Sequence, residues 1–188
     1  MLGLAFASTL ERAKSGDEAA FALLFRDLQP ALIRYLRVIS RTAVEDLAAE
    51  TWLDVVKGLA RFSGDEAGFR SWVFTIARRR HIDVLRSMSR RPEEVSTEDD
   101  AERSEFGLQD PVALAAEDKN ELETALRMIA RLPPAQAEVV MLRAVAGLSV
   151  AEVADVVGRR PGAVRILAHR GLRRLAEELA AKPGPVEV

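Results

Sequence analysis

Apolar residues recur at steps of three or four along most of the chain, which is the spacing of helices with one buried face. The first such series comprises Phe21, Leu24, Leu28, Leu32, Tyr35 and Ile39. Ser15 and Glu18 have the spacing of a capping box, which predicts that a helix begins there. Pro30 lacks the backbone N–H that a helix interior needs, so we expect it to end or kink this helix.

Two more helices are predicted before residue 92. Thr42 and Glu45 form a second capping-box spacing, and one side of the helix that follows consists of Leu47, Thr51, Val55, Leu59 and Phe62. The stretch SGDEAG at 63–68 predicts a loop because of its glycines and serine. The third helix, over 69–91, has most of its arginines outward, and its inner side comprises Phe69, Trp72, Val73, Ile76 and Leu85.

The second half of the chain contains a helix-turn-helix pattern. Ser149 and Glu152 give a third capping-box spacing, which opens a short helix over 150–157. Gly158 follows where a left-handed cap is needed, and Pro161 suits the first turn of a new helix. Upstream, Pro134 suits the start of a helix that ends near Gly147. Alternating strand patterns are absent, so the sequence predicts an all-α protein.

Charge is strongly segregated, although the 188 residues carry a net charge of only −2. Residues 66–92 are net +5 and residues 159–174 are net +6, whereas residues 93–123 are net −10. The acidic stretch has few large apolar residues and cannot offset its ordering entropy, which predicts a flexible linker. We therefore expect two small helical domains, 12–92 and 118–182, joined by an acidic linker over 93–117.

The composition excludes several kinds of chemistry. The chain has no Cys and only two histidines, His81 and His169, which rules out a thiol nucleophile and makes a metal site unexpected. No nucleophile–base pair or glycine-rich phosphate loop is recognisable, so neither an enzyme nor a cofactor is predicted. No apolar run is long enough to span a bilayer, and no signal peptide is evident. We expect a soluble, cytoplasmic protein without membrane insertion.

The helix after Pro161 is predicted to face DNA. Its packed side consists of Val164, Leu167 or Ala168, Leu172 and Leu175, and its outer side of Arg165, Ile166, His169, Arg170 and Arg173. Arginine on such a face can bond guanine edges or phosphates. The alternative is a solvated arginine face on a two-helix hairpin. Six arginines and no acid within sixteen residues favour DNA.

Four stretches together resemble the extracytoplasmic-function (ECF, group IV) sigma factors of bacterial RNA polymerase. They are VEDLAAETWLDVVKGLARF (44–62), FRSWVFTIARRRHIDVLRSMSRR (69–91), RLPPAQAEVVMLRAVAGLSVAEVADVVG (131–158) and PGAVRILAHRGLRRL (161–175). The resemblance implies that the first domain is the sigma region 2 helical bundle and the second is the region 4 helix-turn-helix. It also implies promoter DNA, double-stranded at the −35 element and melted at the −10 element, as a partner.

By the same resemblance, 44–62 docks on the clamp helices of the largest polymerase subunit, and region 4 meets the polymerase flap. The residues expected to bind core polymerase are Asp46, Glu50, Leu53, Asp54 and Lys57. Three acids at steps of four form one stripe, which suits a basic helical partner. The alternative is a solvated face in which Asp54 pairs with Lys57.

The resemblance further implies that the loop 63–68 captures a flipped base of the −10 element while arginines track the strand. The residues expected to contact −10 DNA are Ser63, Asp65, Glu66, Arg78, Arg79, Arg80, Arg86 and Arg90. Arg78, Arg79 and Arg80 could equally be an ordinary exposed run. Many members of the family have Asn where this chain has Arg80.

The residues expected to contact −35 DNA are Arg160, Ala163, Arg165, Ile166, His169, Arg170 and Arg173. Ile166 stands where the family often has Ser and cannot donate a hydrogen bond, so we expect an unusual −35 preference. The acidic linker either tethers the domains or threads into the polymerase. The resemblance also implies an anti-sigma factor. The alternatives are a stand-alone helix-turn-helix regulator with a ligand-binding or dimerising first domain, and a structural helical adaptor.

Overall fold

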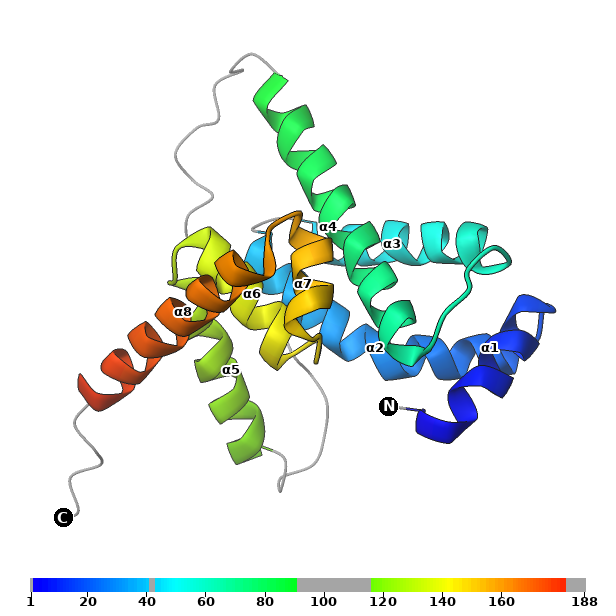
Figure 1. The fold of residues 1–188 in the computed structure, drawn as a ribbon, viewed down its shortest axis with the longest axis horizontal. Helices are drawn as coiled ribbons and strands as arrows, with labels where there is room; N and C mark the ends of the chain where they lie inside the picture. The colour runs from blue at the N-terminus through cyan, green and yellow to red at the C-terminus, as the bar shows by residue number, and fades with distance from the viewer. Residues whose placement is uncertain (1, 41–42, 91–115, 182–188) are drawn as a thin grey trace.

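The computed structural model describes residues 2–40, 43–90 and 116–181. These residues form helices and short connections, without a strand among them, as the all-α prediction requires (Figure 1). The elements before residue 91 are η1 (Gly3–Ala5), α1 (Phe6–Lys14), α2 (Glu18–Ile39), α3 (Val44–Leu59) and α4 (Glu66–Arg90). Those after residue 115 are α5 (Ala116–Ala130), α6 (Pro134–Ala144), α7 (Val150–Val157) and α8 (Pro161–Ala181). We call the two groups the N-terminal and C-terminal lobes.

Helix α2 begins and continues differently from the prediction. Its N-cap is Asp17, whose side chain accepts a hydrogen bond from the Ala20 N–H at 3.0 Å, so the cap does not come from Ser15. Ser15 instead follows the last turn of α1. Pro30 lies inside α2 and does not end it. The apolar face continues on both sides of Pro30, and its burial outweighs the loss of one backbone hydrogen bond.

Helix α3 also lacks the capping box predicted for its start. Thr42 lies outside the described residues, and the N-cap of α3 is Ala43, which has a left-handed backbone and no side-chain cap. The inner side of α3 is otherwise as predicted, with Leu47, Thr51 and Val55 buried. Gly58 lets α4 approach closely, because a Cβ at this position would lie 2.7 Å from the Trp72 ring.

The helix-turn-helix forms as the sequence predicts. Ser149 accepts a hydrogen bond from the Glu152 N–H at 3.2 Å, and the Glu152 carboxylate accepts one from the Ser149 N–H at 2.6 Å. Gly158 closes α7 in the left-handed conformation. Helix α8 then crosses α6 closely at Gly171, where a Cβ would lie 2.8 Å from Val140.

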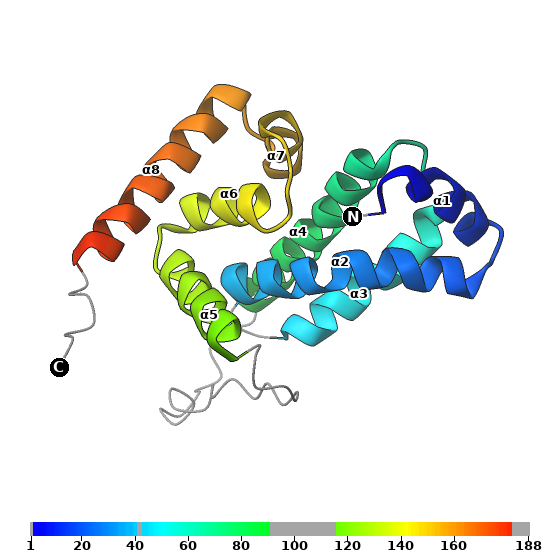
Figure 2. The same ribbon diagram turned by 90° about the horizontal axis from the view of Figure 1, so that it is seen from below.

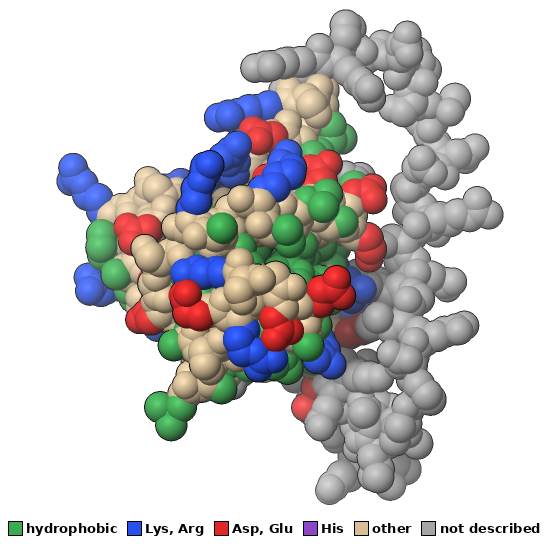
Figure 3. Space-filling view, turned by 90° about the vertical axis from the view of Figure 1, so that its right-hand side faces the viewer, with side chains coloured by type: hydrophobic (Ala, Val, Ile, Leu, Met, Phe, Trp, Pro, Cys, Tyr) green, Lys and Arg blue, Asp and Glu red, His purple; other side chains and the backbone are tan. Residues whose placement is uncertain are grey.

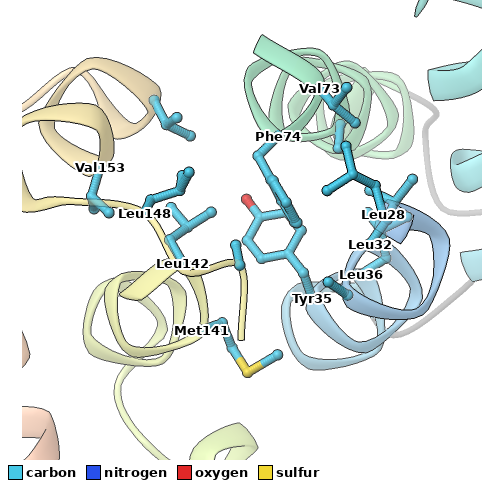
Figure 4. Packing of buried hydrophobic residues seen from close by; sticks show 14 of the residues in the cluster. Leu28, Leu32, Tyr35, Leu36, Val73, Phe74, Met141, Leu142, Leu148 and Val153 are labelled. Atoms are coloured by element: carbon cyan, nitrogen blue, oxygen red, sulfur yellow. The ribbon is translucent and has the colours of Figure 1, made fainter. Parts of the chain in front are cut away.

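The two lobes share one apolar core. Figure 2 shows the second half of α2 between α4 and the C-terminal lobe, and Figure 1 shows α7 beside α4. In Figure 4, Tyr35 and Phe74 face Leu142 and Leu148 across the boundary. The two aromatic rings meet edge to face with their centroids 5.3 Å apart. All four side chains are fully buried, so the free chain has its lobes in contact, a point that the sequence left open.

Candidate nucleic-acid and polymerase interfaces

The outer face of α3 carries the residues predicted to bind polymerase. Asp46, Glu50, Leu53 and Lys57 are exposed, whereas Asp54 is half-buried. Leu53 is 58% exposed, and Val56 beside it, which the sequence analysis missed, is 53% exposed. Their spacing of three residues would have placed both side chains on one face. The face therefore combines an apolar centre with flanking acids.

Asp54 is held from the neighbouring helix. The Arg80 Nε of α4 donates to the Asp54 carboxylate at 2.8 Å, and Lys57 Nζ lies 3.5 Å from the same carboxylate. Partial burial alone would raise the pKa of Asp54, but hydrogen bonds and charge from Arg80 and Lys57 outweigh it and hold this pKa below its usual value. The predicted pairing with Lys57 is present, and the stronger pair, with Arg80, joins α3 to α4.

The arginines of α4 do not form one stripe. Arg79 and Arg86 are exposed, and Arg86 lies 3.8 Å from Asp83. Arg78 points toward the C-terminal lobe, where its Nε donates to Glu138 of α6 at 2.7 Å. Residues two positions apart lie on nearly opposite sides of a helix, so Arg78 and Arg80 cannot face one DNA strand together. The side chain of Arg90 is outside the described residues.

Glu138 is the centre of a polar cluster between the lobes. Besides Arg78, the hydroxyl of Tyr35 donates to it at 3.2 Å. Burial and the nearby negative charge of Glu138 raise the pKa of Tyr35 well above its usual value. His81 lies beside this cluster in a cavity of about 310 Å³, and its Nδ1 is buried without a hydrogen-bond partner among the described residues. Burial lowers the pKa of His81.

A second polar contact crosses the boundary at Arg70. Its side chain is buried, donates to Asp27 at 3.0 Å and reaches the Ala146 carbonyl oxygen at 3.4 Å. Arg70 belongs to the basic stretch of 66–92 in the sequence. Its charge is instead compensated inside the protein.

The predicted loop 63–68 is shorter in the structure, because α4 begins at Glu66 and not at Phe69. The Asp65 carboxylate accepts a hydrogen bond from the Gly68 N–H at 2.8 Å and so caps α4. The Glu66 carboxylate accepts hydrogen bonds from the backbone of Leu2 and Gly3. Ser63 is exposed. Figure 3 shows the side of the molecule toward α1 and this loop, where basic and acidic side chains are interspersed.

Helix α8 presents its basic face to solvent. Arg160, Arg165, His169, Arg170 and Arg173 are exposed, and Ile166 is 53% exposed among them. Ala163 is half-buried. Among the described residues, Arg173 pairs with Glu177 at 3.3 Å, whereas Arg165 and Arg170 make no ion pair.

The packed side of α8 differs from the prediction at one residue. Val164 is fully buried, and Leu167, Ala168 and Leu175 pack against the core as predicted. Leu172 was predicted to be packed, but it is 56% exposed. Gly171 occupies the contact with α6 instead, because α8 approaches too closely there for a larger side chain.

The described residues were also searched for a metal site. No group of three or more His, Asp or Glu side chains in this part of the chain is arranged to hold a metal ion.

Across residues 2–40, 43–90 and 116–181, no helix is both long enough and apolar enough to cross a membrane.

Together these features define a two-lobed helical protein with a DNA-binding helix-turn-helix. The family model for sigma-70 region 2 matches residues 24–91, and that for sigma-70 region 4 matches residues 122–175. The chain is 32% identical to the ECF RNA polymerase sigma factor ShbA of Streptomyces griseus, covering 88% of this chain and 91% of ShbA. The chain therefore belongs to the ECF RNA polymerase sigma factors, as the sequence motifs indicated.

Other relatives and structures are similar. The chain is 36% identical to the ECF sigma factor BldN of Streptomyces coelicolor over 90% of this chain, and it spans 64% of the length of BldN. The structure of CnrH in complex with the cytosolic domain of CnrY matches with a TM-score of 0.63 at 24% identity, covering 95% of this chain and 99% of CnrH. RpoE of Bartonella quintana in complex with the anti-sigma factor NepR matches with a TM-score of 0.61 at 21% identity, covering 87% and 98%. These two likenesses show the fold.

Proposed function

We propose that the chain is a promoter-specificity subunit, which binds core RNA polymerase in the cytoplasm and directs it to promoters with −10 and −35 elements. It has no catalytic role of its own in this proposal. The observation that supports it best is the combination, in one chain of this family, of an exposed acidic and apolar face on α3 with an exposed basic helix α8. A stand-alone regulator has no need of the first surface.

The face of α3 is the proposed docking site for the clamp helices of the largest polymerase subunit. Leu53 and Val56 supply apolar contact, while Asp46, Glu50 and Asp54 attract a basic partner. Such charges raise the association rate and select the partner, and the apolar centre adds affinity. Lys57 lies at the margin of this face, and region 4 is proposed to meet the flap.

Helix α8 is proposed to read the −35 element from the major groove. Its contacts come from the exposed set Arg160, Arg165, Ile166, His169, Arg170 and Arg173, with Ala163 at the edge. The exposed Ile166 can pack on a thymine methyl but cannot bond a base edge. This supports an unusual preference at one −35 position. A selection from randomised −35 sequences, compared with that of Ile166→Ser, tests it.

The −10 element is proposed to be melted and held along α4 and the loop 63–68. Arg79 and Arg86 are exposed and lie two helical turns apart on one side of α4, so they suit the backbone of a single strand. Arg78 can join them only after releasing Glu138, and Arg80 only after releasing Asp54 and Glu50. The chain as described is therefore proposed to be a closed form that opens on the polymerase.

An anti-sigma factor is the proposed regulator. CnrH and RpoE of Bartonella quintana, which share this fold, were solved with CnrY and with the anti-sigma factor NepR. A partner that favours the closed form would keep α3, α4 and α8 from binding polymerase, the −10 element and the −35 element at the same time.

Run-off transcription tests the proposal directly. The chain is mixed with core polymerase and a library of genomic promoter fragments, and transcripts are mapped. Discrete start sites that require both core polymerase and this chain are the expected result. Leu53→Asp should abolish them, and Leu23→Asp, at another exposed leucine of the N-terminal lobe, is the matched control. Tight duplex binding by the chain alone, with no polymerase-dependent start sites, would indicate a stand-alone regulator.

A further inference from the structure

The carboxylate of Glu66 is held by the beginning of the chain. Its Oε1 accepts a hydrogen bond from the Leu2 N–H at 2.7 Å, and its Oε2 accepts one from the Gly3 N–H at 3.0 Å. Glu66 is the first residue of α4 and directly follows the loop that ends at Asp65. Hydrogen bonds to an ionised carboxylate are about twice as strong as those between neutral groups. Two of them therefore join segments more than sixty residues apart.

Residues 2–5, which we call the N-terminal turn, pack on the core at their first residue, whereas Leu4 is fully exposed. Leu2 is half-buried against the core, and Phe6 directly after the turn contacts Phe69 of α4, with ring centroids 5.7 Å apart. The space left between the turn, α2 and α4 is only about 10 Å³. Gly3 has a φ of +55°, a conformation that other residues rarely adopt. The turn is thus shaped to aim two adjacent N–H groups at one carboxylate.

Both carboxylates expected to meet a flipped base accept backbone hydrogen bonds instead. Asp65 caps α4 through the Gly68 N–H, and Glu66 is occupied by the N-terminal turn. Both were expected to line the pocket for a flipped base. These bonds make the two carboxylates supports of the loop. Ser63, Gly64 and Asp65 are exposed and Glu66 is half-buried, and of these side chains the hydroxyl of Ser63 is the polar group that caps no helix. Phe62 packs beneath Gly64, with a ring atom 3.1 Å from where a Cβ would stand.

We infer that the N-terminal turn is a positioning element of the −10 loop: the amides of Leu2 and Gly3 hold Glu66, and Glu66 with Asp65 fixes where Ser63 and Gly64 meet the melted strand. This inference rests on the proposed function. It assigns base contact in the loop to Ser63 and the backbone at 63–64, and a supporting role to Glu66. A fixed loop captures a base with less loss of conformational entropy than a mobile one.

Two variants test the inference in the assembled holoenzyme. Glu66→Gln keeps the size of the side chain but places an amide NH₂ opposite one backbone N–H, where no hydrogen bond can form. Deletion of residues 2–5 removes both donors. The measurement is the affinity of holoenzyme for single-stranded −10 DNA beside that for a duplex −35 fragment. Each variant should weaken −10 binding about tenfold and leave −35 binding unchanged.

The control separates positioning from general destabilisation. Asp17 caps α2 in the same lobe by accepting one backbone hydrogen bond, so Asp17→Asn also removes a carboxylate that caps a helix. Thermal unfolding is recorded for all variants. If Asp17→Asn, at equal loss of thermal stability, weakens −10 binding as much as Glu66→Gln does, the positioning role is overturned. The double variant, deletion plus Glu66→Gln, should be no worse than either single change, because both remove one interaction.

Two other outcomes have distinct meanings. In the first, Glu66→Gln changes the preferred −10 base, while the deletion of residues 2–5 leaves −10 binding intact. This result would show that Glu66 contacts the base directly, and it would overturn the inference. A wild-type holoenzyme that binds no −10 DNA at all would overturn the proposed function and, with it, the inference. Equal, −10-specific losses in both variants support it.

Discussion

The two arginine-rich helices of this sigma factor differ in what their arginines contact. In α4, Arg78 bonds Glu138 at 2.7 Å and Arg80 bonds Asp54 at 2.8 Å. In α8, Arg165 and Arg170 are exposed and have no ion pair among the described residues. The α8 surface proposed for duplex DNA is therefore accessible in the free chain. On the α4 surface proposed for the melted strand, two arginines are instead paired with carboxylates of the protein.

The difference follows from where each helix lies. Helix α4 packs on α3 of its own lobe and on α7 of the other, so its arginines lie within reach of acids on neighbouring elements. Helix α8 lies at the edge of the C-terminal lobe, where it contacts α5, α6 and α7 and leaves its arginine-rich face exposed. Both pairs of α4 exclude much of the solvent, which makes them stronger than surface pairs. An arginine in such a pair binds a DNA phosphate only after the ion pair opens and its partner carboxylate contacts another cation or solvent.

The largest expected effect is that of Glu138→Lys. The new cation would face Arg78 and leave the Tyr35 hydroxyl without its acceptor. We expect a loss of about 3 kcal/mol in the free energy of unfolding and a larger radius of gyration as the lobes separate. Urea unfolding and small-angle scattering measure the two. Asp155→Lys, at an exposed acid of α7, is the control. An unchanged radius would show that the cluster does not hold the lobes together.

Arg165→Ala should have the next largest effect, on the α8 side of the comparison. An exposed arginine without an ion pair is free to contact DNA, so its loss should weaken binding of a −35 duplex by roughly tenfold. Fluorescence anisotropy at several salt concentrations measures the affinity and its salt slope. Arg131→Ala, at an arginine paired with Glu178, should change neither. Equal losses in both variants would contradict a specific role for Arg165.

Asp54→Asn should have a smaller effect of opposite sign. Removing the charge of Asp54 leaves Arg80 only the weaker pair with the exposed Glu50, at 3.6 Å, so the isolated chain should bind single-stranded −10 DNA about threefold more tightly, with a salt slope steeper by about 0.7. The double variant with Arg80→Gln should lose this gain. Asp83→Asn, which removes the weaker 3.8 Å partner of Arg86, is the matched control. A gain that persists without Arg80 would indicate a simple change in net charge.

The smallest effect concerns the single tyrosine of the chain. Burial is the main cause that raises the pKa of Tyr35, and the charge of Glu138 adds to it. A tyrosine whose folded pKa is raised favours the folded state below its unfolded pKa of about 10, and this stabilisation is lost as the pH rises further. Phenolate absorbance should therefore appear well above pH 10. Glu138→Gln should lower the midpoint but keep it above 10. A wild-type midpoint near 10 would contradict the buried arrangement.

The sequence predicted features that depend on neighbouring residues. The capping box of Ser149, the left-handed Gly158 and the exposed face of α8 all follow from spacings of a few residues, and all are present. Leu85 and Leu172 were predicted to be packed but are exposed, and Pro30, expected to end or kink its helix, does not end α2; in each case packing against other helices outweighed a local rule. The partners of Arg78 and Arg80 lie 60 and 26 residues away along the chain, and no local pattern encodes those distances. The N–H groups of Leu2 and Gly3 are likewise more than sixty residues from Glu66 along the chain, and no local pattern predicts their hydrogen bonds.

The capping box at the start of α7 affects how the DNA-facing surface of α8 can change during evolution. Ser149, Glu152 and Gly158 fix both ends of α7 with bonds and backbone angles internal to the motif. None of these residues lies on the exposed face of α8, so substitutions there remove none of these bonds. The recognition face can therefore diverge residue by residue, as Ile166 illustrates, without each new promoter preference requiring a new fold of the turn.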